Sequence, residues 1–255
     1  MPAPADPFEK VLVLVKAVPQ PSKTHVETVC CAGVTSGRLW RRMFPVRFRQ
    51  LSDGSQFARW QWVEYRHGPP KDDPRKESRR VFEDTLRPGA TMPERERPGF
   101  LAPLILDGLA AAAARGDSLA LVRPASSRFY WRPRSKADMD EARDAYARAA
   151  RQDSFLDQEL AAFEPPPYDF RVACRDAGGE HDYRCGDWET TAAFFNLRRS
   201  YAEADVLAHL ARTYNEARTG RGLVMAMGNM KKRPNQWQLL GLLAVPDEPQ
   251  LGLLL

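Results

Sequence analysis

The chain is poor in cysteine and has no long apolar run, and these absences argue against a secreted disulfide-rich protein and against a membrane-spanning one. Its four cysteines are Cys30, Cys31, Cys174 and Cys185, too few for the disulfide framework of a secreted protein. The N-terminus, MPAPADPFEK, lacks the basic segment and apolar core of a signal peptide. No apolar run approaches the roughly 18 residues that a membrane span needs. We therefore expect a cytoplasmic protein without membrane contact.

The chain also lacks the short motifs of several common enzyme classes. It contains no P-loop, no GxGxxG, no HExxH and no GxSxG, and it has no internal repeat. These absences argue against nucleotide hydrolysis, dinucleotide binding and the common hydrolases. With 43% hydrophobic residues and six tryptophans, the 255 residues can form a proper core in one large or two modest domains.

Residues 38–66 are the most informative segment of the chain. They hold seven arginines and seven aromatic residues but only two acids, Asp53 and Glu64. Guanidinium groups bind phosphate and aromatic faces stack on any base, so this mixture suits nucleic-acid binding. The net charge of +5 also favours an acidic partner. The alternative is a half-buried sheet whose arginines extend along apolar surface to reach solvent.

The N-terminal third reads as short strands. Expected strands cover residues 10–18, 25–34, 38–49 and 57–66. Within 38–49, alternation places Trp40, Phe44, Val46 and Phe48 on an inward face and Arg41, Arg47 and Arg49 on an outward one, while Arg42 breaks the pattern. Four such strands predict a small barrel or curled sheet.

The rest of the chain predicts mixed structure. We expect a long loop over 67–98 with a short helix near Ser78, followed by a helix over 101–114 and a strand over 118–123. Helices are expected between 135 and 163, and the first begins with a capping box at Ser135 and Asp138. A strand over 168–174, helices from about 187 and over 202–217, and strands over 223–230 and 237–245 follow. The fold class is therefore α+β, a β-rich, barrel-like N-terminal module packed on a mixed C-terminal half. The expected domains are 1–70, a connector over 71–124, a helical insertion over 125–167 and a closing unit over 168–255, unless all form one continuous unit.

A second cluster of chemically active residues lies between 174 and 189. Cys174, His181 and Cys185 are zinc-ligand types, although neither cysteine has a closely spaced partner. His181, Asp187 and Glu189 could serve acid–base or Mg²⁺-dependent phosphodiester chemistry. The alternative is that Asp187 caps a helix and Glu189 complements its dipole.

Six segments together resemble an uncharacterised family of bacterial proteins. They are HVETVCCAGVTSGRLWRRMFPVRFRQL, QFARWQWVEYR, DDPRKESRR, SLALVRP, GGEHDYRCGDWE and MAMGNMKKRPNQWQLLGLL. Cys174, His181, Asp187, Trp188 and Glu189 match a Cys, Gly-His and Asp-Trp-Glu pattern of the family, but a second cysteine before the histidine is absent here. The resemblance implies that these segments belong to one unit, and it implies no activity.

The leading prediction is a nucleic-acid-binding protein with little sequence specificity, for DNA or RNA, in a bacterial mobile-element or phage-defence system. One alternative is a metal-dependent nuclease using His181, Asp187 and Glu189, and another is a subunit of a protein assembly. We expect no cofactor, with Mg²⁺ or Zn²⁺ as alternatives. The expected nucleic-acid contacts are Arg38, Trp40, Arg41, Arg42, Arg47, Arg49, Arg59, Trp60, Trp62, Lys231, Lys232 and Arg233.

Overall fold

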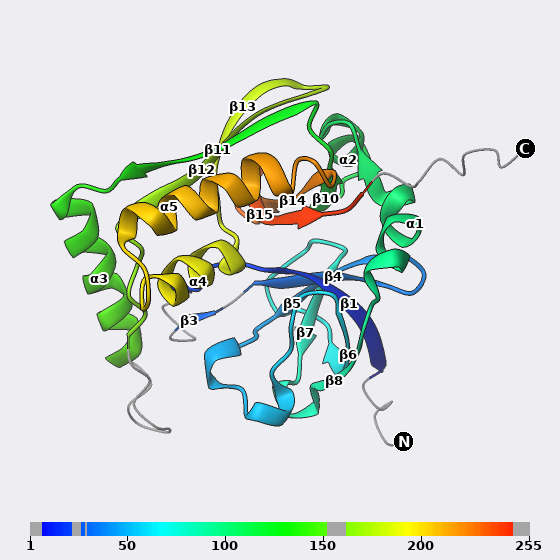
Figure 1. The fold of residues 1–255 in the computed structure, drawn as a ribbon. Helices are drawn as coiled ribbons and strands as arrows, with labels where there is room; N and C mark the ends of the chain where they lie inside the picture. The colour runs from blue at the N-terminus through cyan, green and yellow to red at the C-terminus, as the bar shows by residue number, and fades with distance from the viewer. Residues whose placement is uncertain (1–6, 22–26, 29, 152–161, 247–255) are drawn as a thin grey trace, which may run out of the picture. The chain divides into compact units, whose positions relative to one another are not determined.

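The computed structural model describes residues 7–21, 27–28, 30–151 and 162–246, and the chain divides into two compact units (Figure 1). The first unit contains Met1–Thr91 and Arg132–Asp169, and the second contains Met92–Trp131 and Phe170–Leu255. The first holds a closed five-stranded barrel, and the second mixes helices and sheets. The expected α+β class with a barrel-like N-terminal module is confirmed.

The barrel closes because its first strand pairs on both sides. β1 (Phe8–Lys16) pairs with β4 (Cys31–Thr35) and with β6 (Gln61–Gly68), and β5 (Trp40–Phe44) and β7 (Ser78–Val81) complete the ring. β8 (Arg87–Thr91) adds to β6, and β2 (Gln20–Pro21) pairs with β3 (Glu27–Thr28) outside the ring. Val11, Val13, Met43 and Val63 fill the interior. A Cβ at Gly33 would lie 2.1 Å from the Leu12 carbonyl oxygen, so β1 and β4 approach closely only because this residue is glycine.

The strand order identifies the type of barrel. Around the ring it runs β1, β4, β5, β7, β6 and back to β1; β5 and β7 are parallel, and every other pair is antiparallel. This is the order of the OB-fold, a five-stranded Greek-key barrel. Because β5 and β7 are parallel neighbours, the β4–β5 turn (residues 36–39) and the β6–β7 loop (69–77) lie at the same end of the barrel.

The strand expected over 38–49 is wrong in its second half. β5 ends at Phe44 because Pro45 has no N–H to donate to a ladder. Two short 3-10 helices, Phe48–Gln50 and Asp53–Ser55, then lead toward β6. The expected outward row of arginines therefore does not form. Arg42 is 4% exposed, whereas Phe44, assigned to the inward face, is 43% exposed.

The segment 67–98 contributes two strands to the barrel sheet. β7 and β8 occupy positions where a loop and a short helix near Ser78 were expected. β7 pairs with β5 and β6 and so closes the ring. The domain boundary expected near residue 70 therefore lies inside the barrel.

A helical arm, Arg132–Asp169, belongs to the first unit. Its helix α3 (Lys136–Arg151) begins after Ser135, whose Oγ accepts a hydrogen bond from the Asp138 N–H (3.1 Å), as the capping motif predicts. The Tyr146 hydroxyl donates to the Pro19 carbonyl (2.7 Å), and the Tyr146 and Phe163 rings lie 4.9 Å apart. Part of the expected helical insertion, 152–161, lies outside the described residues.

The second unit is built on two sheets. One has the order β15–β14–β10–β9 and the other β11–β12–β13. The elements are α1 (Arg97–Leu101), β9 (Ile105–Leu106), α2 (Ala110–Ala114), β10 (Leu119–Val122), β11 (Ser126–Pro133), β12 (Tyr168–Asp176), β13 (Gly179–Arg184), α4 (Trp188–Leu197), α5 (Glu203–Arg212), β14 (Leu223–Met230) and β15 (Arg233–Ala244).

Most elements of this unit were expected, with three differences. The helix expected over 101–114 is two short helices, α1 and α2, separated by β9. β11 occupies the start of the expected helical insertion, and β15 begins at Arg233, so only Lys231 and Lys232 form the connecting turn. Within the described residues, no helix combines the length and the apolarity that crossing a membrane requires.

Candidate nucleic-acid interface

The outer side of β5 and β7 carries exposed aromatic and basic side chains. Phe44 lies opposite Arg80 in the parallel pairing, and both point away from the core that Met43 enters. The Arg80 guanidinium lies 5.3 Å from the centre of the Phe82 ring, and that of Arg66 lies 6.0 Å from it. Together with the half-buried Trp40, which shares the parity of Phe44, these residues form a surface that we call the β5–β7 face: Trp40, Phe44, Arg66, Arg80 and Phe82.

The two loops at one end of the barrel extend this face with positive charge. Arg38 is exposed in the β4–β5 turn with φ at +60°, and the neighbouring Leu39 is 57% exposed. Lys71 and Lys76 are exposed in the β6–β7 loop. The loops therefore place cations at the end of the face where β5 and β7 begin.

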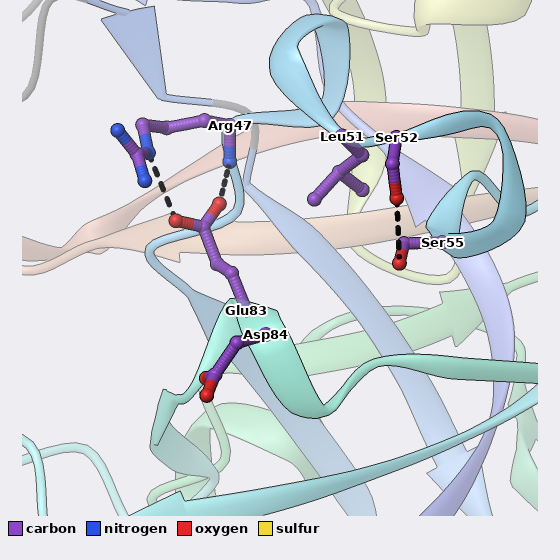
Figure 2. A pocket seen from close by; sticks show the side chains of 6 residues that line it. All are labelled: Arg47, Leu51, Ser52, Ser55, Glu83 and Asp84. Atoms are coloured by element: carbon purple, nitrogen blue, oxygen red, sulfur yellow. Dashed lines mark hydrogen bonds and ion pairs between the residues drawn. The ribbon is translucent and has the colours of Figure 1, made fainter. Parts of the chain in front are cut away.

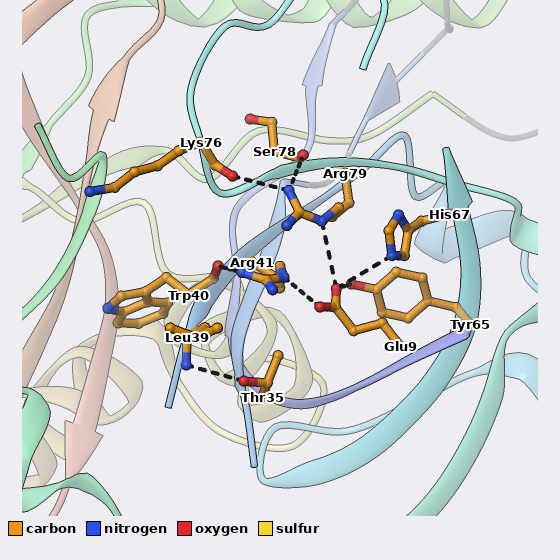
Figure 3. A network of polar contacts seen from close by, with 10 residues as sticks. All are labelled: Glu9, Thr35, Leu39, Trp40, Arg41, Tyr65, His67, Lys76, Ser78 and Arg79. Carbon is orange, nitrogen blue, oxygen red and sulfur yellow. Dashed lines mark hydrogen bonds and ion pairs between the residues drawn. The ribbon is translucent and has the colours of Figure 1, made fainter. Parts of the chain in front are cut away.

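A charged network inside this end of the barrel holds the start of β5 (Figure 3). Glu9 accepts a hydrogen bond from Arg41 Nε (2.6 Å) and pairs with Arg79 Nε at 3.8 Å. The Tyr65 hydroxyl and His67 Nε2 also approach the Glu9 carboxylate, at 3.4 and 3.8 Å. Burial, and then the Glu9 charge, raise the pKa of Tyr65 above its ordinary value. Arg41, expected outside, is thus an internal partner of Glu9.

The β6–β7 loop has its own internal support. Asp73 accepts two hydrogen bonds from the Arg75 guanidinium, at 2.8 and 2.6 Å, and one from the Ser78 hydroxyl at 2.8 Å. Burial alone would raise the pKa of Asp73, but these hydrogen bonds outweigh it and lower the pKa to about 2. The ionised Asp73 therefore ties the loop to the start of β7.

Replacing Asp73 with asparagine should destabilise the protein by about 1 kcal/mol at neutral pH, a value discounted for solvent screening. Because the folded-state pKa of Asp73 lies below its ordinary value, its contribution is present above about pH 4 and lost as the pH falls toward 2. Urea unfolding of the wild type and Asp73→Asn at several pH values between 7 and 2 measures this. A difference in unfolding free energy that stays constant over this range would contradict the assignment.

Arg42 and Arg47, two of the expected contacts, have internal roles. Arg42 is buried, approaches the Cys30 sulfur at 3.7 Å, and has a pKa lowered by that burial. Arg47 donates from its backbone N–H and from Nε to the Glu83 carboxylate, at 2.5 and 2.9 Å. Figure 2 shows this pair at the edge of a pocket of about 260 Å³, whose other lining residues are Leu51, Ser52, Ser55 and Asp84.

The remaining expected contacts of the first unit lie away from the β5–β7 face. The Arg49 guanidinium lies 5.9 Å from the centre of the Phe163 ring, on the helical arm. Arg59 is half-buried, and the Trp60 N–H donates to the Val13 carbonyl (2.8 Å). Trp62 lies on β6 opposite Leu12, with the Lys10 ammonium 5.8 Å from its ring. Two of the residues that were expected to contact nucleic acid, Arg38 and Trp40, therefore lie on this face or in its loops.

Besides Lys71 and Lys76 of the β6–β7 loop, four members of the β5–β7 face were missed in the sequence. They are Phe44, assigned to the inward face, and Arg66, Arg80 and Phe82, which received no role. The signal was present in the run Ser78-Arg79-Arg80-Val81-Phe82, where basic, β-branched and aromatic residues indicate a strand. This strand was missed because a helix was expected near Ser78. In the second unit, Lys231, Lys232 and Arg233 are exposed at the β14–β15 turn, as expected for a basic hairpin tip.

The expected zinc ligands do not converge. Cys174 and His181 face each other across β12 and β13, but Cys185 lies just beyond the end of β13, four residues after His181 and roughly 13 Å away. His181 Nε2 instead pairs with Asp176 Oδ1 at 2.9 Å, a partner that sequence reasoning missed. Burial, and then Asp176, raise the pKa of Cys174 to about 11, which disfavours the thiolate. The described residues contain no group of three or more metal-ligand side chains placed to hold an ion.

Asp187 has the geometry of a helix cap. It is fully buried, and its Oδ1 accepts a hydrogen bond from the Glu189 N–H (3.0 Å) at the start of α4. Its Oδ2 accepts from the Leu242 N–H of β15 (2.9 Å). Both oxygens thus bind backbone groups of the protein, and the contacts favour capping over catalysis at Asp187.

Comparison with known proteins finds two family models and no match among curated proteins. Residues 7–101, which include the barrel strands, match a domain of unknown function described as DUF8758. Residues 106–254, more than half of the chain, match a second domain of unknown function, DUF8757. The chain therefore belongs to the DUF8757 family, and its residues 7–101 match the DUF8758 model.

Proposed function

We propose that this protein binds nucleic acid through the β5–β7 face of its barrel, with little dependence on sequence. The observation that carries the proposal is an exposed aromatic ring, Phe44, flanked by Arg80 on an OB-type barrel wall. Aromatic rings stack on bases of any identity, and guanidinium groups bind phosphates. In OB barrels, the face of the second and third strands and the loops after the first and fourth strands bind oligonucleotides. The third strand here is β5 and the loop after the fourth is the β6–β7 loop, so the analogy of fold supports this part of the proposed face.

Burial selects this side of the barrel over its neighbours. The outward residues of β1 and β4, namely Leu12, Leu14, Ala32 and Val34, are fully buried. A bound nucleic-acid strand would therefore contact β5, β7 and the two loops that precede them. Arg38, Lys71, Lys76 and Arg80 supply four exposed cations there. Asp73 is held by Arg75, which limits repulsion of a phosphate.

The test is fluorescence anisotropy with short labelled single strands and duplexes of DNA and RNA, with and without Mg²⁺. If the four cations each neutralise one phosphate of a single strand, affinity should fall about 50-fold between 50 and 200 mM salt. The double variant Arg38→Glu/Arg80→Glu should bind more weakly and show a fall of only about 7-fold, because two contacts remain.

A matched control is Lys10→Glu/Arg87→Glu, which changes the net charge equally on β1 and β8 of the same unit. This control should retain the salt dependence of the wild type. Binding that is insensitive to salt, or equal losses in both double variants, would contradict the proposed face. Cleavage of the oligonucleotides with Mg²⁺ would favour the alternative phosphodiesterase.

A further inference from the structure

The connection between β14 and β15 in the second unit is exposed along seven consecutive residues, 230–236, which we call the hairpin tip. Asn229 of β14 pairs with Trp237 of β15. The next residue of β14, Met230, pairs with Arg233, so three extra residues of β15 lie between the two pairs. The first six residues of β14 are buried. The hairpin tip is therefore a solvent-exposed end of a strand pair that is anchored in the core of its unit.

Side-chain hydrogen bonds brace the hairpin tip. Asn229 Nδ2 donates to the Pro234 carbonyl (3.1 Å), and Arg233 Nη1 donates to Gln236 Oε1 (3.4 Å). The Asn229 N–H donates to the Ser118 carbonyl at the start of β10 (3.0 Å). A braced turn loses less conformational entropy when it binds a partner than a free loop does.

The hairpin tip carries concentrated positive charge. Its consecutive residues Lys231, Lys232 and Arg233 are all exposed. The sequence contains no acid between Glu216 and Asp247, a stretch that includes β14, β15 and five cations. The strand pair itself therefore offers no carboxylate to offset the charge at its tip, and the tip suits a polyanion.

The residues beside these cations favour nucleic acid over other polyanions. Asn235 and Gln236 carry side-chain amides, which hydrogen-bond base edges and sugars. The half-buried ring of Trp237 follows directly, and aromatic rings stack on bases. A lipid surface fits less well, because segments that bind membranes insert several large apolar side chains, and Met230 is the one such residue of the tip.

We propose that the hairpin tip is a second contact surface for nucleic acid, which binds phosphates beyond the stretch held by the β5–β7 face. This inference rests on the proposed function of the barrel. Two linked binding surfaces raise the effective concentration of a strand at the second one, so a strand that reaches both binds more tightly than a short one. The chemistry at the tip is phosphate binding by Lys231, Lys232 and Arg233.

The experiment compares the salt dependence of binding for labelled oligothymidylates of about 6 and about 40 nucleotides. If each of the three cations neutralises one phosphate, the affinity for the long strand should fall about 20-fold more than that for the short strand between about 50 and about 200 mM salt. Lys231→Gln/Lys232→Gln/Arg233→Gln, the tip variant, should lose this additional fall and bind the short strand like the wild type.

A matched control is Arg95→Gln/Arg199→Gln/Arg221→Gln, which removes three exposed cations from the same unit outside the hairpin tip. This control should keep the additional fall for the long strand. Thermal unfolding at the wild-type temperature shows that both triple variants fold. Photo-crosslinking of a long oligonucleotide that contains halogenated bases should label the peptide containing Trp237.

The outcomes separate failure of the hairpin tip from failure of the barrel face. Unchanged salt dependence in the tip variant, with no crosslink to its peptide, would overturn the proposal and leave the tip to an acidic protein. Equal changes in the tip variant and the control would also overturn it, because net charge alone would then explain the effect. If Arg38→Glu/Arg80→Glu leaves short-strand binding intact, the barrel proposal fails instead.

Discussion

Replacing both Trp40 and Phe44 with alanine should weaken binding of a single strand by a factor between about 30 and about 20,000. Stacking of one base on one aromatic ring contributes about 1–3 kcal/mol, so two rings contribute roughly 2–6 kcal/mol. The two residues share one face of β5 and are separated by Arg42, whose guanidinium is buried. Bases that contact β5 would therefore stack on the Trp40 and Phe44 rings, and the phosphates would bind to the cations of the loops and to Arg80.

The measurement is again anisotropy, and the salt dependence identifies the mechanism. Because both rings are neutral, the double variant should keep the wild-type slope of affinity against salt while its affinity falls at every salt concentration. Phe8→Ala is the matched control, since Phe8 is 50% exposed on β1 of the same unit. Trp40→Phe should recover part of the loss. If Phe8→Ala and Phe44→Ala lowered the affinity equally, the position of Phe44 on the β5–β7 face would not matter, and the proposed stacking site would be contradicted.

Replacing Asp187 with alanine should lower the free energy of unfolding by about 2–4 kcal/mol. Loss of a helix N-cap costs about 1 kcal/mol, and the Leu242 N–H would be left without its acceptor in a buried strand, at a cost of about 1–3 kcal/mol. Urea unfolding followed by tryptophan fluorescence measures this change. Asp187→Asn keeps an oxygen acceptor and should retain part of the stability.

Glu189→Ala tests the neighbouring carboxylate. Glu189 lies in the first turn of α4, where a negative charge interacts favourably with the helix dipole, so its loss should cost less than about 1 kcal/mol. The contrast between the two variants separates capping from catalysis. Unchanged stability in Asp187→Ala together with loss of a Mg²⁺-dependent cleavage activity would restore the catalytic hypothesis.

The elements that could be predicted are those whose signal lies within a few residues. The run VLVLV predicts β1 because its β-branched and leucine side chains are buried on both faces. β14 has the expected bounds, and α4 begins at its expected cap. Pro45 was also a readable signal, since a proline inside a strand pattern ends or edges the strand. The alternation of arginine and aromatic residues nevertheless led to the prediction of a strand that continues past Pro45 to residue 49.

The partners of the arginines could not be predicted, because they are distant in the sequence. Arg41 pairs with Glu9 across 32 positions and Arg47 with Glu83 across 36. Which arginine faces solvent depends on which strands are neighbours, and only the closed ring determines that. The arginine-rich segment therefore contains part of the proposed face, while the partners of its individual arginines depend on strand pairing that no local pattern contains.

The helical arm has a consequence for synthesis. Residues 132–169 join the same compact unit as the barrel, although they fall within the region matched by the second family model. Domains generally fold as units as the chain emerges from the ribosome, N-terminal part first. Here the first unit is complete only when residue 169 of 255 has been made. All strands of the barrel are made by residue 91, but the Pro19 carbonyl meets its Tyr146 donor only after the first part of the second unit has been translated.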